Sequence, residues 1–366
     1  MSILYDEGQQ AIATEVQRVL DASYASERLK TLLETRGRYD ETFWALAREQ
    51  GWTGIAFPEE HGGLGMGLVE LGLVAEACGS VAAGAPFLNS SFGVGHALLN
   101  YGDAALTGEW LPKLASGEAI GAVAFAEGAD ILPTEPTVRI VNGRLHGTKP
   151  AVTGGASADV AVVLAAGEHG PVLALVALAQ DGVDRDVLET FDNSRGAADL
   201  RFDGAEATAF ENMGDALAAA LDVLRRQAVV TAHEQVGGAR RMMEAARDYA
   251  LTRRAFGQPI GAFQSIKHRI SENYVLVELA RANAIHAAAS ADDAVEFPRA
   301  AAAARLMATD AYDTVSRDAT QSHGGIGVTW EADLHLHQRR ARSLAIEHGN
   351  MMFWEDALVE ELEGAA

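Results

Sequence analysis

Two short segments in the last third of the chain combine residue types that bind phosphate groups and heterocyclic bases. A guanidinium presents forked donors that match phosphate oxygens, and an aromatic ring supplies a stacking wall. A side-chain amide both donates and accepts hydrogen bonds, and glycine lets the backbone approach a ligand closely. We call this set the nucleotide grip, and its members are Arg253, Phe256, Gln264, Gln321, Gly324 and Gly325. Each residue alone would fit a helix surface or a turn, but together they predict a nucleotide site.

Acid-base chemistry has weaker candidates. A catalytic base needs a carboxylate or imidazole that reaches a substrate proton. Glu347 and His348 are adjacent near the C-terminus, and Glu234 lies about two helical turns after Gln227. Glu234 also fits a polar group that is satisfied at a contact between helices. For His323 we expect a structural hydrogen bond, because no acidic partner lies near it in sequence.

The elements that position these residues fall into three parts. Apolar residues at three- and four-residue spacing predict a helical domain over residues 1–118. Short β-branched runs then predict a β-barrel-like or sandwich domain over 119–212, with strands at 138–141, 159–165, 172–177 and 199–202. Asn142-Gly143 predicts a tight hairpin turn, because both residues tolerate positive φ. Long Ala- and Leu-rich helices predict a four-helix bundle over 213–366. The fold class is therefore α+β and mostly α.

A glycine cluster at residues 58–65 superficially resembles a phosphate-binding loop. Such a loop needs a preceding strand and a βαβ unit around it, whereas helical patterns flank this cluster. We therefore expect a turn that uses glycines at positive φ.

Composition excludes several classes of function. The 366 residues are 48% hydrophobic and 22% charged, a globular balance, with a formal net charge of -22. That charge opposes binding to nucleic acid and to anionic membranes. The lone cysteine, Cys78, cannot form an internal disulfide, and no metal-ligand cluster is evident. The N-terminus has no secretory-signal pattern, and no run of eighteen apolar residues occurs, so we expect a cytoplasmic protein.

The chain resembles the acyl-CoA dehydrogenase family along nearly its whole length. The resemblance rests on the two grip segments and on four further stretches, which are residues 52–65, 147–149, 189–192 and 201–204. It implies an α, β, α architecture with FAD at a subunit interface, where the grip of one subunit holds the nucleotide of its neighbour's flavin. It also implies α,β-dehydrogenation of an acyl-CoA thioester, with electron-transfer flavoprotein or a similar acceptor.

The sequence departs from the family where a subunit contacts its own flavin and substrate. The two family positions for the catalytic glutamate align with His348 and Gln227, and a family arginine aligns with Ala228. The flavin-packing Trp-Ile-Thr appears as Ala-Val-Thr at 151–153, and a family Gly-Ser-Asp is missing from 127–131. Glu347 is displaced by one residue, which turns a helical side chain by about 100°.

Whether a family residue is retained or missing depends on which flavin site it serves. The residues that a subunit lends to its neighbour remain, and those that serve its own site are missing. We therefore expect the non-catalytic partner in a heterotetramer with a second acyl-CoA dehydrogenase-like chain. Split complexes of this kind within the family act in bacterial steroid side-chain degradation, which suggests the pathway by analogy. The alternative is a self-sufficient homo-oligomer that uses a displaced base, Glu347 or Glu234.

Overall fold

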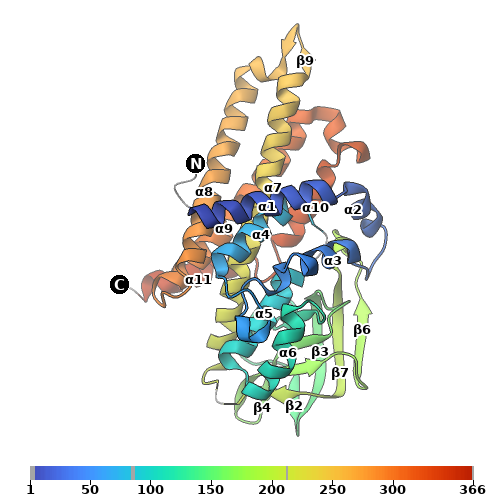
Figure 1. Cartoon of the computed structure of the whole chain (residues 1–366), viewed down its shortest axis with the longest axis vertical. Helices are drawn as coiled ribbons and strands as arrows, with labels where there is room; N and C mark the ends of the chain where they lie inside the picture. Colours follow the sequence, from blue (N-terminus) through green and yellow to red (C-terminus); the bar gives the residue numbers. More distant parts are fainter. Residues whose placement is uncertain (1–4, 84–86, 212, 365–366) are drawn as a thin grey trace. The chain divides into compact units, whose positions relative to one another are not determined.

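The structure is a computed structural model that describes residues 5–83, 87–211 and 213–364. It divides into two compact units, and Figure 1 traces the elements of both. Unit 1 comprises Met1–Glu27, Leu68–Ala83 and Ala228–Ala366, and unit 2 comprises Arg28–Gly67 and Gly84–Gln227. The predicted order of helices, then a sheet, then longer helices is confirmed.

The first third of the described chain is helical. Aspartates cap three of its helices. The side chain of Asp6 accepts the Gln9 amide hydrogen, that of Asp40 accepts the Phe43 amide hydrogen, and that of Asp103 accepts the Ala105 and Leu106 amide hydrogens. The helices are α1 (Glu7–Ser23), α2 (Ser26–Leu33), α3 (Glu41–Glu49), α4 (Leu68–Ser80), α5 (Phe87–Tyr101) and α6 (Ala104–Ala115). Short 3₁₀ turns, η1 (Trp52–Gly54) and η2 (Glu59–His61), lie between α3 and α4.

The glycine cluster at 58–65 is a turn, as expected. Gly62 and Gly65 have φ values of 81° and 64°. The amides of Gly63, Leu64 and Gly65 donate to carbonyls of the same loop, at 3.1, 2.9 and 2.8 Å. Because those amides are already used, the loop does not present them to a phosphate.

Unit 2 contains an eight-stranded mixed sheet with the order β6-β7-β3-β2-β4-β5-β8, in which β1 pairs with β4. Its strands are β1 (Gly121–Ala124), β2 (Arg139–Val141), β3 (Arg144–Thr153), β4 (Val160–Gly167), β5 (Gly170–Ala177), β6 (Val183–Val187), β7 (Ala197–Glu206) and β8 (Thr208–Ala209). The predicted strands correspond to β2, β4, β5 and β7. Asn142 and Gly143 join β2 to β3 with φ values of 50° and 72°, as the hairpin prediction requires.

The last third consists of long helices and two short hairpin strands. The helices are α7 (Ala216–Thr252), α8 (Gln264–Ala289), α9 (Glu296–His323), α10 (Leu334–Leu344) and α11 (Met351–Glu363). In unit 1, buried side chains from α7, α8, α9 and α10 form one core that includes Met242, Val277, Tyr312 and Leu344. A Cβ on Gly237 would lie 1.8 Å from the carbonyl oxygen of Glu76, so α4 and α7 cross closely at this glycine.

Candidate functional site

The first grip segment is a hairpin at the tip where α7 and α8 meet (Figure 1). Its strands, β9 (Arg254–Ala255) and β10 (Gln258–Pro259), are joined by Phe256 and Gly257, with φ values of 51° and 83°. The Arg254 guanidinium donates to the carbonyl of Gly257 at 2.9 Å. A positive φ is unusual for an aromatic residue, and Phe256 is 96% exposed. The turn therefore presents this ring outward.

The second grip segment lies at the C-terminal end of α9 and packs on α7 through an aromatic stack. The ring of His323 stacks on Tyr249 of α7, with centroids 4.3 Å apart. Its Nδ1 lies 2.7 Å from the carbonyl oxygen of Ala319, which agrees with a structural role. Tyr249 lies four residues before Arg253, one helical turn away. We did not single out Tyr249 from the sequence, where its only signal is this spacing.

The side chains of the grip are available to a ligand. Arg253, Gln264 and Gln321 are exposed. Within the described chain, no hydrogen bond or ion pair engages these three side chains. Gly324 and Gly325 are also exposed, and a Cβ built on either meets no atom within 4 Å among the described residues. Unused donors and open backbone are the features that a phosphate-bearing ligand requires.

The base segment, residues 344–350, has the opposite character. Arg305, almost fully buried on α9, donates to the carbonyl oxygens of Glu347 at 2.9 Å and Gly349 at 3.4 Å, and also to that of Leu344. His348 and Gly349 have φ values of 55° and 104°, and the Asn350 side chain then caps α11. The guanidinium thus holds a strained turn through its carbonyls.

Arg305 belongs to a buried charge cluster with Arg340, Glu234 and Glu347. The Arg340 guanidinium lies 2.9 Å from the Glu234 carboxylate and also donates to the carbonyls of Ala82 and Ala83. Burial lowers the pKa of Arg305 to about 10, against the opposing effect of the Glu347 and Glu234 carboxylates. The two carboxylates proposed as displaced bases therefore lie beside buried arginines.

Comparison with known proteins identifies the family. The acyl-CoA dehydrogenase N-terminal and C-terminal domains match residues 6–118 and 214–352. "Acyl-CoA dehydrogenase IpdE2" of Mycobacterium tuberculosis is 31% identical over 311 residues, which cover 84% of this chain and 82% of that protein. The chain belongs to the acyl-CoA dehydrogenase family.

Two solved structures, each named for a pair of proteins, are similar over nearly the whole chain. A variant of the Tcur3481-Tcur3483 steroid ACAD has a TM-score of 0.89 at 26% identity, covering 98% of this chain and 99% of that one. The ChsE4-ChsE5 complex from Mycobacterium tuberculosis has a TM-score of 0.88 at 26% identity and covers 99% of each chain.

Members of the acyl-CoA dehydrogenase family bind FAD. The grip suits the nucleotide half of that cofactor, since a free guanidinium matches pyrophosphate oxygens and an exposed ring matches adenine. Among the described residues, no group of three or more His, Cys, Asp or Glu side chains is placed to hold a metal ion. In the same part of the chain, no helix is both long and apolar enough to cross a membrane.

The remaining positions at which the sequence departs from the family lie in unit 2, except Ala228, which is fully buried in unit 1. Gln227 is fully buried, and its side-chain amide donates to the carbonyl of Asn89 at 3.2 Å. Ala151 has a φ of 49°, and its amide donates to Asp199 at 2.7 Å. At these positions the side chains are an amide in the core and a methyl group, neither of which can remove a proton.

The altered loop at 127–131 begins with a carboxylate that is used structurally. Glu127 accepts hydrogen bonds from the Lys149 ammonium at 2.6 Å, from the amide and hydroxyl of Thr137 at 2.7 and 2.6 Å, and from the Val138 amide at 3.1 Å. Burial would raise the pKa of Glu127, but these hydrogen bonds outweigh it and lower the value to about 2. Glu127 therefore stays ionised and anchors the loop to β3.

Proposed function

We propose that this chain is the non-catalytic subunit of a heteromeric FAD-dependent acyl-CoA dehydrogenase, lending its nucleotide grip to a flavin whose ring and substrate belong to a second chain. The observation that carries the proposal is the contrast in unit 1. The grip is exposed with unused donors, while the base segment is tied down beside a buried, charge-compensated cluster. A residue that serves a neighbouring subunit has to lie on the surface.

The role of each grip residue follows from its chemistry. Arg253 would hold the pyrophosphate, and Phe256 would cover the adenine. Gln264 and Gln321 would bond polar groups of the nucleotide, and Gly324 and Gly325 would let it approach the backbone. Bound FAD supplies the acceptor for the β-hydride of the thioester.

Glu347 and Glu234 enter this proposal as structural groups, not as bases. A base must approach the substrate and exchange its proton with it. Glu234 instead faces the Arg340 guanidinium at 2.9 Å, and both carboxylates are more than nine-tenths buried. Removing either would leave a buried arginine without its counter-charge.

The similar paired structures support the assembly and the substrate class. Both are complexes of two named chains, and one is described as a steroid ACAD. We propose by analogy a heterotetramer that acts on the CoA thioester of a steroid side chain and passes electrons to an electron-transfer flavoprotein or a similar acceptor. A cytoplasmic location stays a prediction from sequence.

The test is expression of the chain alone and together with a second acyl-CoA dehydrogenase-like chain that carries a glutamate at either base position. Bound FAD per chain and thioester dehydrogenation are then measured for both preparations. We expect little flavin and no turnover from the chain alone, and a complex that turns over with fewer flavins than subunits. Full flavin occupancy and turnover by the chain alone would refute the proposal.

A further inference from the structure

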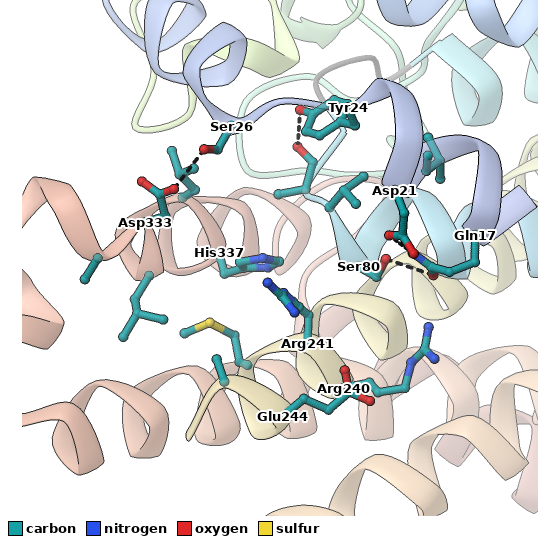
Figure 2. Close-up of a pocket in the computed structure, with 18 residues that line it drawn as sticks. Gln17, Asp21, Tyr24, Ser26, Ser80, Arg240, Arg241, Glu244, Asp333 and His337 are labelled. Carbon is teal, nitrogen blue, oxygen red and sulfur yellow. Dashed lines mark hydrogen bonds between the residues drawn. The ribbon is translucent and has the colours of Figure 1, made fainter. Parts of the chain in front are cut away.

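A cavity of about 500 Å³ in unit 1 is separate in sequence from both the nucleotide grip and the base segment. Residues of α1, the end of α4, α7 and the start of α10 line it, and Figure 2 shows its side chains. About this volume is typical of pockets that bind small molecules. Val81, Ala245 and Ala332 supply partly exposed apolar wall, so an occupant can bury both an apolar body and a polar group.

Most of the polar groups on the wall already have partners. The Gln17 amide donates to Asp21 at 2.9 Å, and Ser80 donates to Gln17 at 3.2 Å. Ser26 donates to Asp333 at 2.8 Å. The Arg240 Nε lies 3.6 Å from a carboxylate oxygen of Glu76. These groups form the frame of the cavity.

Arg241 and His337 differ from these partnered groups. In Figure 2 the Arg241 guanidinium and the His337 ring point toward one another. Within the described chain, no hydrogen bond or ion pair engages the guanidinium of Arg241. The Nδ1 of His337 lies 2.8 Å from the Tyr312 hydroxyl, and no described contact uses its Nε2. A cationic fork and a ring nitrogen are thus left for an occupant.

Positive groups outweigh negative ones in the immediate surroundings of the His337 ring. Burial, together with the charges of Arg241 and Arg340, lowers the pKa of His337 to about 3 against the smaller opposing effect of Asp333. The ring is therefore neutral in a locally positive field. Three carboxylates on the same wall oppose an anion. They are Glu244, one helical turn after Arg241, Asp21, which accepts from Gln17, and Asp333, which accepts from Ser26.

We propose that this cavity binds a small organic anion, with its carboxylate or phosphate group held by Arg241 and the ring of His337 and its apolar body against Val81, Ala245 and Ala332. Calorimetric titration of the full-length chain with hexanoate, butyl phosphate and inorganic phosphate tests this. We expect saturable binding of the two amphiphiles, and weaker binding of inorganic phosphate, which has no apolar body. The stronger amphiphile then tells a carboxylate ligand from a phosphate ligand.

Two variants should shift the affinity in opposite directions. Arg241→Ala removes the charged donor and should weaken binding about tenfold or more. Glu244→Gln removes one repelling charge and should strengthen binding about twofold. The matched control is Arg247→Ala, an exposed arginine of the same helix that pairs with Asp248 at 2.8 Å, and it should leave binding unchanged.

The remaining outcomes overturn the proposal. Affinity that is unchanged in Arg241→Ala would place the anion elsewhere. Binding that disappears when the second chain is added would make the cavity part of a subunit interface. Flavin content of the complex should be unchanged in Arg241→Ala, which keeps this result distinguishable from a failure of the proposed subunit role.

Discussion

The nucleotide grip and the base segment both belong to unit 1, but the arginines that serve them lie in opposite environments. Arg253 is exposed and unpaired among the described residues, so its guanidinium is free for a ligand. Arg305 is almost fully buried, and its two terminal nitrogens donate to Gln235, Thr309 and carbonyls of the base segment. An exposed cation contributes little to folding stability, whereas removal of a buried, paired cation strongly destabilises the fold. The difference separates residues that we propose serve binding from residues that serve folding.

The largest expected effect comes from removing the buried guanidinium. In Arg305→Met, Glu347 and Glu234 lose a compensating charge and three carbonyls lose their donor, so we expect a loss of about 3–5 kcal/mol in unfolding free energy. Urea denaturation followed by circular dichroism measures it. The control is Arg317→Met on the same helix, where the arginine is 62% exposed and pairs with Asp313, and the loss should stay within about 0.5 kcal/mol. Similar losses in both variants would contradict the contrast.

The second effect concerns binding at the grip. Arg253→Ala removes a charged donor from the proposed pyrophosphate contact, which corresponds to about 1.5–3 kcal/mol, or tenfold or more in flavin affinity of the complex. The unfolding free energy of the chain should not change, because the side chain is exposed. Flavin titration of the apo-complex measures the affinity, and Arg247→Ala is the control. A loss of stability with unchanged flavin affinity would reverse our assignment of the two regions.

How far the sequence predicted these regions depends on the range of the interactions. The Asn142-Gly143 turn is a local property, and it was predicted correctly. Strands β1 and β6 were missed, because one is four small residues long and the other has three consecutive charged residues at 184–186. The grip residues follow from type and spacing, but their ligand stays a prediction.

Contacts made through the fold were out of reach. Arg305 meets the base segment about forty residues further on, and only packing of α9 against that segment brings them together. The stacking of Tyr249 on His323 likewise depends on the packing of two helices, α7 and α9. Single residues carry no signal of such partners when they are separated by this much chain.

The third effect concerns two carboxylates of unit 2, a partly buried one, Glu127, and an exposed one, Glu206. Because the folded-state pKa of Glu127 is about 2, below its ordinary value of 4.5, its stabilisation is full above pH 4.5 and is lost as pH falls toward 2. Glu127→Gln should therefore lower the unfolding free energy by about 1–2 kcal/mol at pH 7 and by less at pH 3. Urea midpoints over this pH range measure it. Glu206→Gln is the control, since Glu206 is 74% exposed and pairs with Arg144, and its profile should match the wild type.

The smallest expected effect is also the sharpest test of the base segment. His348→Glu places a carboxylate at a family base position, yet we expect no thioester dehydrogenation by the chain alone. The turn at residue 348 is held by Arg305 with a φ of 55°, and Gln227, Ala151 and Glu127 retain their own contacts in unit 2. A base accelerates proton removal only when the substrate is positioned beside it. Activity of the complex should stay within about twofold, under 0.5 kcal/mol in barrier height. Anaerobic flavin reduction by a thioester measures both preparations. Reduction in the variant chain alone, with none in wild type, would mean that this subunit keeps a complete site of its own and lacks only the glutamate.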